Sequence, residues 1–253
     1  MKICRFAYKN SIYFGRLTNE SVEPLENYQL KTIKQTLPIS KVKILPPVIP
    51  SKIVCVGRNY REHAEELGNE VPKEPLLFLK APSAIITNEN PIILPKQSSR
   101  VEHEAELAII ISKKCKSISP EENPLNYVLG YTCLNDVTAR DLQKKDIQFT
   151  RAKSFDTFCP IGHFIETSLD PNNLKIEARV NGKIKQKAHT SQMIFPVEFL
   201  IRYISNYMTL MPFDIIATGT PAGVSPLNPG DICEIEIENI GILKNPVKRE
   251  DEL

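Results

Sequence analysis

The sequence has no excess of either charge, no long apolar run and few glycines. Its 253 residues carry 32 lysine and arginine side chains against 30 aspartate and glutamate side chains, a net charge of +2. We therefore expect no nucleic-acid or membrane partner, because such partners select a basic surface. No apolar run approaches the length of a membrane span, and the first residues lack the apolar stretch of a secretion signal.

The cysteines lack any pairing pattern. No two of the six are spaced as CxxC, which argues against a zinc ribbon or a dithiol redox motif. Three of them, at positions 55, 133 and 233, lie in apolar, strand-like text, where a reduced thiol packs as a small hydrophobic group. We therefore expect free thiols and a cytoplasmic location.

Ten glycines against twenty prolines favour short strands joined by stiff connections. The proline-rich segment 45–52 predicts a boundary between a small N-terminal domain (1–48) and a larger domain (49–248), which a charged tail (249–253) follows. Strand-like runs predominate, and the few helical segments do not alternate with them regularly. The pattern predicts an α+β fold or a β-roll rather than a doubly wound sheet.

Several segments have clear local signals. A polar helix is predicted over 59–68, and a continuous strand over 101–112. A hairpin is predicted over 174–188, with Asn181-Gly182 at its tip, and an amphipathic helix over 196–211. The sequence contains no GxGxxG loop after a strand, no GxxxxGK[ST], no HExxH and no GxSxG. Nucleotide-binding, zincin and nucleophile-elbow sites therefore lose their main support.

Three glutamates alternate along the predicted strand 101–112. Side chains of a strand point to opposite faces in turn, so Glu102, Glu104 and Glu106 share one face, about 6.5–7 Å apart along the strand. That face becomes apolar after Glu106, which places at least this carboxylate in the buried part of the strand. Crowded carboxylates repel unless they meet a cation, and Mg²⁺ or Mn²⁺ prefers such oxygen ligands. A solvated edge strand that faces lysine or arginine is the alternative.

A second polar group follows the strand-like run 128–136. Asp136 ends that run, and Arg140 and Gln143 lie four and seven residues further on, along one stripe of a predicted helix. A carboxylate, a guanidinium and an amide at the end of a strand form a plausible polar site. A helix N-cap at Asp136, or a structural Asp136–Arg140 ion pair, explains the pattern equally well.

His63 and Glu66 lie three residues apart in the predicted helix 59–68, so the carboxylate can orient the imidazole as a general base. A surface His–Glu pair without a catalytic role is the alternative. Lys80 and Lys153 each interrupt apolar text, and either reach solvent or point into a polar cavity. The loop 218–224, TGTPAGV, suits the approach of an anionic ligand to the backbone or forms an ordinary tight turn.

Six motifs occur here in the order found in the fumarylacetoacetate hydrolase family, which the sequence resembles over residues 45–247. They are GRNYREHAEELG, LFLKAPSAI, HEAELAIII, NDVTARDLQ, KSFDTFCPIG and TGTPAGV. The likeness is greatest to the short-chain members, namely acylpyruvate hydrolases, oxaloacetate decarboxylases and the decarboxylase/isomerases of homoprotocatechuate breakdown. The resemblance implies a mixed β-roll with peripheral helices and a small N-terminal β segment, a catalytic domain over 49–248, and a homodimer.

The resemblance also implies roles for individual residues. Glu104, Glu106 and Asp136 correspond to the metal ligands of the family. His63 and Glu66 correspond to its catalytic dyad, which lies on a lid over the substrate.

Four further positions correspond to residues that contact the substrate in the family: Arg140, Gln143, Lys153 and Thr220. Lys153 also counts among the expected catalytic residues, because it would neutralise charge on the substrate. Val137 stands where an aromatic residue is frequent in the family, a departure that bears on packing rather than on ligation.

The implied activity is that of a Mg²⁺- or Mn²⁺-dependent enzyme, in which Ca²⁺ could replace the cofactor in a crystal. We expect hydrolysis of the C–C bond of acylpyruvate-type 2,4-dioxo acids through a metal-stabilised pyruvate enolate, with His63 activating water. The alternatives are decarboxylation of oxaloacetate or of 5-oxopent-3-ene-1,2,5-tricarboxylate, and isomerisation of 2-hydroxyhepta-2,4-diene-1,7-dioate. A non-catalytic β module that holds Ca²⁺ is a further alternative, although it gives no reason for the accompanying histidine and lysine.

Overall fold

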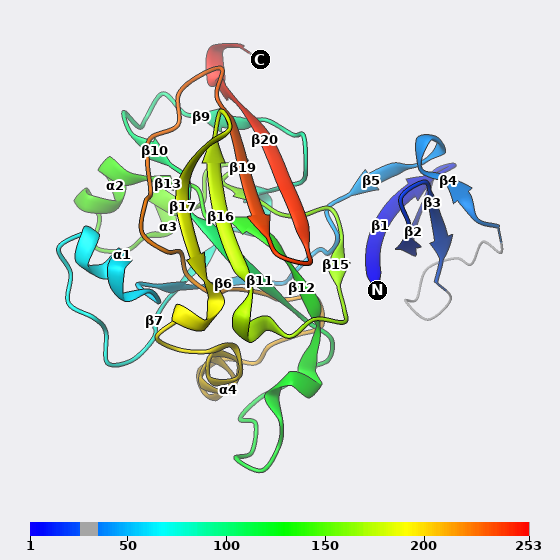
Figure 1. Ribbon diagram of the computed structural model, residues 1–253, viewed down its shortest axis with the longest axis horizontal. Helices are drawn as coiled ribbons and strands as arrows, with labels where there is room; N and C mark the ends of the chain where they lie inside the picture. Colours follow the sequence, from blue (N-terminus) through cyan, green and yellow to red (C-terminus); the bar gives the residue numbers. More distant parts are fainter. Residues whose placement is uncertain (26–34, 253) are drawn as a thin grey trace.

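The computed structural model describes residues 1–25 and 35–252. Strands build two main sheets, and the few helices lie at the periphery (Figure 1). This arrangement confirms the prediction of an α+β fold with a mixed β-roll. Residues 26–34 of the predicted N-terminal domain, and residue 253 of the predicted tail, lie outside the described residues.

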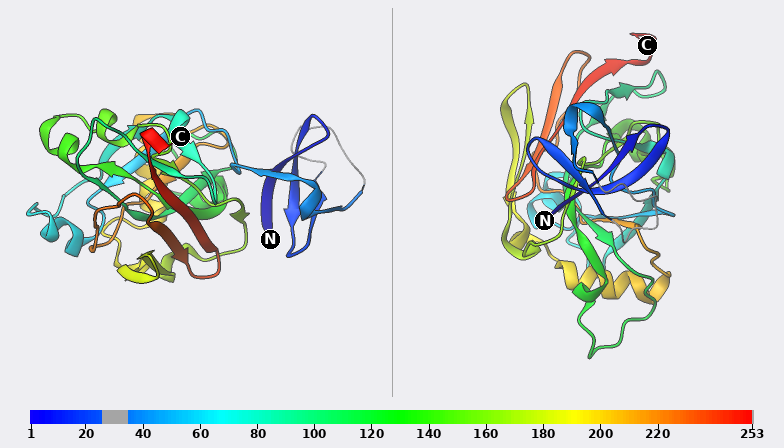
Figure 2. Two further views of the ribbon diagram at one scale, coloured as in Figure 1. Left: turned by 90° about the horizontal axis from the view of Figure 1, so that it is seen from above. Right: turned by 90° about the vertical axis from the view of Figure 1, so that its right-hand side faces the viewer.

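The N-terminal strands stand beside the rest of the molecule and are joined to it by the segment after β5 (Figures 1 and 2). They are β1 (Lys2–Tyr8), β2 (Ser11–Leu17), β3 (Ser21–Pro24), β4 (Leu37–Pro38) and β5 (Lys43–Leu45). Strand β1 also pairs with β15 (Ile165–Glu166), with Lys2 opposite Glu166. The N-terminal strands are therefore continuous with the central sheet through a short stretch of pairing.

The central sheet has the strand order β4-β3-β2-β1-β15-β12-β11-β18-β6-β7, with β5 paired to β1. Its other members are β6 (Ile53–Gly57), β7 (Leu76–Lys80), β11 (Ala105–Ile111), β12 (Val128–Asn135) and β18 (Ile215–Ala217). Strands β18 and β6 run parallel, and β11 runs antiparallel to both β12 and β18. Every residue of β11 is buried, as expected of a strand covered on both faces.

A second sheet has the order β17-β16-β19-β20-β9. Its strands are β9 (Ile92–Leu94), β16 (Lys175–Val180), β17 (Lys183–His189), β19 (Ile232–Ile237) and β20 (Gly241–Arg249). The predicted hairpin is confirmed, since β16 and β17 are joined at Asn181-Gly182. Both turn residues have left-handed φ angles, 53° and 75°, as a two-residue hairpin turn requires.

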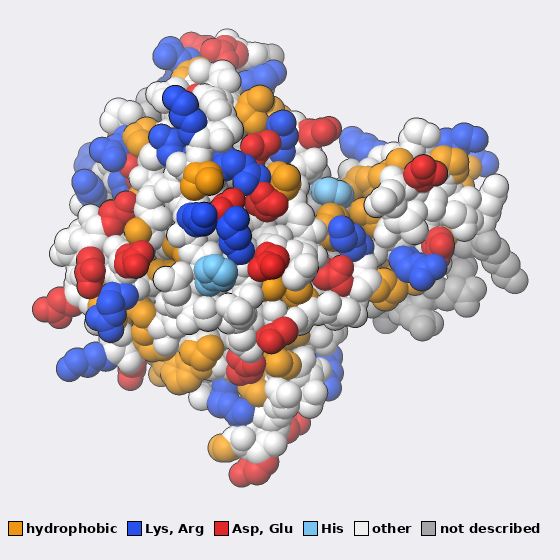
Figure 3. Space-filling model, viewed as in Figure 1, with side chains coloured by type: hydrophobic (Ala, Val, Ile, Leu, Met, Phe, Trp, Pro, Cys, Tyr) orange, Lys and Arg blue, Asp and Glu red, His pale blue; other side chains and the backbone are white. Residues whose placement is uncertain are grey.

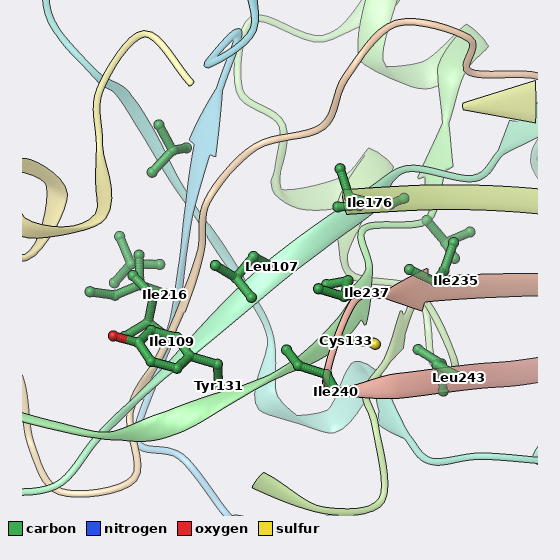
Figure 4. Packing of buried hydrophobic residues seen from close by; sticks show 14 of the residues in the cluster. Leu107, Ile109, Tyr131, Cys133, Ile176, Ile216, Ile235, Ile237, Ile240 and Leu243 are labelled. Atoms are coloured by element: carbon green, nitrogen blue, oxygen red, sulfur yellow. The ribbon is translucent and has the colours of Figure 1, made fainter. Parts of the chain in front are cut away.

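The two sheets pack face to face through apolar side chains (Figure 4). Leu107 and Ile109 of β11 belong to one buried cluster with Ile176, Ile235 and Leu243 of the second sheet. The opposite face of β11 contributes Ala108 and Ile110 to a separate cluster. The alternation predicted for this strand is thus confirmed, and both of its faces are core.

The helices are short and lie outside the sheets. They are α1 (Arg61–Glu66), α2 (Arg140–Lys145), α3 (Thr150–Lys153) and α4 (Val197–Tyr207). Helix α4 is shorter than the predicted 196–211, because the backbone of Leu210 pairs with that of Cys115 instead of continuing the helix. None of the helices in the described ranges is long and apolar enough to cross a membrane.

The remaining elements are short. The minor strands are β8 (Ile85–Ile86), β10 (Val101–Glu102), β13 (Thr138–Ala139) and β14 (Cys159–Pro160). Single 3₁₀ turns cover Ile39–Lys41, Pro82–Ala84, Pro124–Tyr127, Pro171–Asn173, Thr190–Gln192 and Glu250–Glu252. The prediction of one continuous strand over 101–112 is wrong, since His103 and Glu104 separate β10 from β11. Strand β10 pairs with β13, not with β12.

Candidate active site

Three carboxylates converge where β11 begins and β12 ends. Glu104 and Asp136 lie at these ends, and the amide of Asp136 donates to the carbonyl of Glu104 over 2.9 Å. Glu106 lies two residues after Glu104, within β11. One oxygen from each of Glu104, Glu106 and Asp136 lies within 4.8 Å of the other two. All three side chains are buried, so the cluster is a site within the protein and not a surface patch.

Glu102 does not join this cluster, because the break at residues 103–104 turns it away. Its carboxylate accepts hydrogen bonds from Arg100 at 2.6 Å and from Arg140 at 2.7 Å. The three glutamates were expected to share one face of a strand, but only Glu104 and Glu106 do so. The side chain of His103 points toward the second sheet, where it bonds Gln186 over 3.0 Å.

Two lysines hold Asp136. Nζ of Lys80 lies 2.6 Å from Oδ1, and Nζ of Lys153 lies 2.7 Å from Oδ2. The alternative roles for Asp136 are thereby corrected: it does not pair with Arg140, and it is not an N-cap, because helix α2 begins at Arg140 with Ala139 as its N-cap. Asp136 is instead a fully buried ion-pair partner at the end of β12.

Glu104 has cationic partners on both oxygens. Nη2 of Arg140 lies 2.6 Å from Oε1, and Nζ of Lys153 lies 2.8 Å from Oε2. Arg140 also donates to the amide oxygen of Gln143 over 2.5 Å, so these two residues lie on one side of α2 as predicted. Lys80 and Lys153 both point into the polar interior. Of the two placements considered for them, solvent or a polar cavity, the structure shows the second.

The glutamates of the cluster differ in their electrostatics. Burial and the nearby charges of Asp136 and Glu104 raise the pKa of Glu106 well above its usual value. Burial also disfavours ionised Glu104, but Lys153 and Arg140 outweigh it and lower the pKa of that carboxyl. Glu106 is buried and lacks a cationic partner among the residues that the structure describes, whereas Glu104 and Asp136 each have such a partner. Its carboxylate is therefore suited to binding an added cation.

His63 and Glu66 form the predicted dyad on α1. Nδ1 of His63 lies 3.2 Å from one carboxylate oxygen of Glu66, and the other oxygen accepts a hydrogen bond from the amide of Gly223 over 3.0 Å. The imidazole is buried, whereas the carboxylate is partly exposed. Because Glu66 also binds the loop 218–224, it fixes both the ring of His63 and the position of α1 over the site.

The loop 218–224 supplies backbone and hydroxyl groups. The amide of Gly219 donates to Glu106 over 2.8 Å, and the hydroxyl of Thr220 donates to the carbonyl of Ala105 over 2.9 Å. Gly219 has a φ of 96°, and a Cβ there would lie 2.6 Å from the side chain of Asn59. Only glycine fits here, because the backbone has a left-handed φ and lies close to the side chain of Asn59. The conformation of the loop therefore depends on Gly219.

A cavity of about 260 Å³ connects these groups. Its lining includes eight of the nine predicted site residues: His63, Glu104, Glu106, Asp136, Arg140, Gln143, Lys153 and Thr220. The ninth, Glu66, lies behind His63. The volume suits a small molecule.

Comparison with known proteins agrees with this arrangement. Residues 52–248 match the family model for the fumarylacetoacetate hydrolase C-terminal domain, and residues 1–47 match a model described as Rv2993c-like, N-terminal. The chain belongs to the fumarylacetoacetate hydrolase family. It is 44% identical to the rat protein "Oxaloacetate tautomerase Fahd2a, mitochondrial" over 83% of this chain and 71% of that protein.

Solved structures of the fumarylacetoacetate hydrolase family extend the comparison. A structure described as 2-hydroxyhepta-2,4-diene-1,7-dioate isomerase from Mycobacterium marinum is 41% identical, covers 99% of each chain and has a TM-score of 0.89. The maleylpyruvate hydrolase of Sphingobium sp., solved with manganese and pyruvate, is 31% identical over 98% of this chain and 99% of that chain, with a TM-score of 0.80. These relatives are enzymes of several reaction types.

Some residues that build this family site were missed or undervalued by sequence reasoning. Lys80 was noticed as a polar interruption of apolar text, but it was assigned no role at the site. Asn135 accepts the amide of Glu104 on its side-chain oxygen over 2.9 Å, and Gln186 donates to Thr220 over 2.8 Å. Asn59 is fully buried between Phe195 and Thr218. Asn59 and Asn135 belong to the motifs GRNYREHAEELG and NDVTARDLQ. The sequence, however, does not show which distant groups their side-chain amides bind.

Proposed function

We propose that this protein is a divalent-cation-dependent enzyme that hydrolyses the C–C bond of acylpyruvate-type 2,4-dioxo acids. One observation carries the proposal: three buried carboxylates converge within 4.8 Å at a small cavity that also contains His63 and Lys153. A purely structural cation site would not need a histidine dyad beside it. The chemistry of the site therefore favours an enzyme over a binding module.

The donor set fits a hard divalent cation. Glu104, Glu106 and Asp136 would hold Mg²⁺ or Mn²⁺ through carboxylate oxygens, which these ions prefer. Burial, and then the charges of Asp136 and Glu104, raise the pKa of Glu106, so a cation bound beside it would favour its ionised form. When bound, the cation would act as a Lewis acid that polarises a 2-oxo group and stabilises the negative charge that develops on it.

The charge of the cavity suits an anionic substrate. The four carboxylates of Glu102 and the cluster lie against four cations, Lys80, Arg100, Arg140 and Lys153, so the formal charges of these groups balance. A bound divalent cation would add two positive charges. The carboxylate of a 2-oxo acid and the negative charge that develops on its oxo group would then offset them, and Lys153 can neutralise charge on the substrate because its ammonium group already lies at the cluster.

His63 is the residue that would move a proton. Its Nδ1 lies against Glu66, so the carboxylate favours the tautomer with hydrogen on Nδ1 and leaves Nε2 as the acceptor. In hydrolysis, Nε2 would take a proton from a water molecule that attacks the distal carbonyl. Glu66 also stabilises the imidazolium that forms, and it is itself held by the amide of Gly223.

A second candidate is keto–enol tautomerisation of oxaloacetate. It is favoured by the 44% identity to a protein named as an oxaloacetate tautomerase, against 31% to the named hydrolase. The same histidine would then move a proton to or from carbon, and no water would be consumed. The two reactions differ in their products, because only hydrolysis releases pyruvate from an acylpyruvate.

The test is an assay with Mg²⁺ and with Mn²⁺ that follows pyruvate release from acylpyruvates and, separately, tautomerisation of oxaloacetate. His63→Ala should lower kcat about 10²–10⁴-fold in the favoured reaction, since a general base is lost. His189→Ala is the matched control, because His189 is exposed on β17 and does not line the cavity. Turnover without a divalent cation, or full activity of His63→Ala, would refute the proposal; tautomerisation without pyruvate release would select the second candidate.

A further inference from the structure

A glutamine of the second sheet lies at the centre of a buried hydrogen-bond network behind the carboxylate cluster. Gln186 belongs to β17, where most residues are exposed, but Gln186 itself is 0% exposed. Its amide oxygen accepts hydrogen bonds from Nδ1 of His103 over 3.0 Å and from the backbone amide of Ala105 over 2.9 Å. Its amide nitrogen donates to Oγ1 of Thr220 over 2.8 Å and to the carbonyl of Pro221 over 2.6 Å. The side chain therefore uses both of its acceptor positions and both of its donor positions.

Backbone groups fix which way this amide points. The N–H of Ala105 can only donate and the carbonyl of Pro221 can only accept, so the oxygen of Gln186 must face the first and its nitrogen the second. A flipped amide would set donor against donor and acceptor against acceptor. The same orientation requires a hydrogen on Nδ1 of His103, and Nε2 of the neutral ring then accepts from the hydroxyl of Ser225 over 2.9 Å. The direction of each bond around Gln186 is thus determined.

One partner of this glutamine, Ala105, lies between the two glutamates of the carboxylate cluster. Strand β18 pairs with a later part of β11, residues 108–110, so side chains take the place of a neighbouring strand at Ala105. Its amide binds Gln186, and its carbonyl accepts the hydroxyl of Thr220 over 2.9 Å. Because Gln186 also donates to Thr220, the three residues close a ring of hydrogen bonds. The ring therefore holds the backbone from which both glutamates project.

The same glutamine holds the loop 218–224. This loop lies directly against the backbone of β17, where a Cβ on Gly223 would come within 2.0 Å of a carbonyl oxygen. Two amides of the loop bind carboxylates of the site: that of Gly219 donates to Glu106, and that of Gly223 donates to Glu66. The network thus ties the loop, and through it the histidine dyad, to the strand that bears the carboxylates.

We propose that Gln186 is a positioning residue of the metal centre, which fixes Glu104 and Glu106 against the loop 218–224 and so sets the affinity of the carboxylate cluster for a divalent cation. This inference rests on the proposed function, because it takes the cluster to hold the cation. The effect is indirect, since Gln186 lies outside the lining of the cavity and holds backbone groups and a hydroxyl behind the carboxylates. Removal of a group that supports metal ligands in this way typically lowers metal affinity about 10- to 100-fold.

The test is Gln186→Met, which keeps nearly the same length but cannot make the four hydrogen bonds. Calorimetric titration of the full chain with Mn²⁺ should show an affinity about tenfold or more below that of the wild type. The EPR spectrum of the bound Mn²⁺, which reports the geometry of its ligands, should change as well. A substitution that only destabilised the fold would lower the Tm and leave both of these readouts as they are.

Asn245→Leu is the matched control. Asn245 of β20 is also buried, lies outside the lining of the cavity, and donates to the carbonyls of Thr87 and Asn90 over 2.9 and 2.8 Å. Its replacement therefore removes a buried amide with two backbone partners, as Gln186→Met does, but at a distance from the ring. Asn245→Leu should lower the Tm and keep the Mn²⁺ affinity and the EPR spectrum of the wild type.

A double-mutant cycle tests the ring itself. Thr220→Val removes the hydroxyl at nearly constant volume and should weaken Mn²⁺ binding, whereas Thr220→Ser retains the hydroxyl and should keep most of the affinity. Because both changes open the same ring, the double variant Gln186→Met/Thr220→Val should bind Mn²⁺ no more weakly than the weaker single variant. Fully additive losses would mean that the two side chains act separately and would overturn the ring.

The outcomes separate this inference from the proposed function. A wild type that does not bind Mn²⁺ would refute the proposed function, and this inference with it. If the wild type binds Mn²⁺ and Gln186→Met has the same affinity and spectrum, only the positioning role is refuted, and an equal loss in Asn245→Leu would refute it too. Should Gln186→Met fail to fold, Thr220→Val and Thr220→Ser decide the outcome, and equal affinities of these two variants would overturn the proposal.

Discussion

Glutamates alternate along two strands of this molecule, but in different surroundings. Glu104 and Glu106 at β11 are almost completely buried, with 5% and 1% exposure. Glu234 and Glu236 on β19 have side chains that are 19% and 41% exposed. The outer pair belongs to a sheet face on which acidic and basic side chains intermingle (Figure 3).

The partners of the two pairs differ accordingly. Cations of the neighbouring strands meet the pair on β19: Arg179 of β16 lies 2.5 Å from Glu236 and 3.7 Å from Glu234, and Lys244 of β20 lies 3.3 Å from Glu234. The outer strand therefore matches the solvated strand that was the alternative interpretation of the glutamates near residue 104. In the interior, the cations are fewer than the acids, and Glu106 has no cationic partner within the described residues.

The residues that follow each pair account for the difference. Beyond Glu106, the same face of the strand continues with Ala108 and Ile110, which are fully buried. Beyond Glu236, the next residue of that face is Glu238, which remains exposed. An alternating pair of glutamates thus predicts a site only when its face of the strand continues into the core.

The largest expected contrast is between Glu106→Gln and Glu236→Gln. Loss of the Glu106 carboxylate should abolish Mn²⁺ binding and lower turnover by at least about a hundredfold, because a ligand matters more than the groups that support ligands. Glu236→Gln should change neither. Calorimetric titration with Mn²⁺ and the pyruvate assay measure both effects.

Thermal stability without divalent cations gives a second readout for the same pair. A neutral amide at position 106 removes the cost of burying a charge there and the repulsion from Asp136 and Glu104, so the Tm of Glu106→Gln should not fall below that of the wild type. Undiminished Mn²⁺ affinity in Glu106→Gln would contradict the assignment of the cluster. A fall in Tm would instead show that Glu106 is a structural group.

Much of this architecture was predictable from the chain because its signals are local. Alternation predicted the two faces of β11, and Asn181-Gly182 predicted the hairpin of the second sheet. The helix of 59–68 was predicted with its His63–Glu66 dyad, although only Arg61–Glu66 is helical. These features depend on neighbours in sequence, which periodicity and turn chemistry describe.

The remainder depends on contacts between distant segments. The strand breaks at residues 103–104 because its two parts take different partners: β10 pairs with β13, and β11 pairs with β12. No local pattern indicates which partner a strand will take. Likewise, Lys80 meets Asp136 across 56 residues of sequence, and only the fold brings them together. The sequence identified Lys80 as unusual but could not reveal its partner.

A smaller contrast is expected between Lys80→Met and Lys244→Met. Removal of Lys80 leaves Asp136 buried with Lys153 as its remaining cation, which should cost about 3 kcal/mol in the free energy of unfolding. Lys244 is half-exposed beside Glu234, so its removal should cost less than about 1 kcal/mol. Urea denaturation without divalent cations measures both, and equal costs would show that the interior pair is not special.

The smallest expected effect concerns Glu177 of the outer face, which pairs with Lys175 at 2.8 Å. The hydrogen bond from Lys175 lowers the pKa of Glu177 from its ordinary 4.5, against a weaker opposing effect of burial. A lowered pKa stabilises the folded state above pH 4.5, and this contribution is lost as the pH falls through the folded value.

The loss of stability in Glu177→Gln should therefore be below about 1 kcal/mol at neutral pH and should fade below pH 4.5. Glu102→Gln provides the interior counterpart, because burial raises the pKa of Glu102 but Arg140 and Arg100 lower it overall. Both carboxylates are buried, but Lys175, the partner of Glu177, is 44% exposed, whereas Arg140, a partner of Glu102, is 3% exposed. The two variants should therefore respond differently to salt, because 1 M NaCl screens a pair with an exposed partner more than a pair with both groups buried. Denaturation curves at low and high salt measure this, and equal salt sensitivity would mean that burial does not separate the two regions.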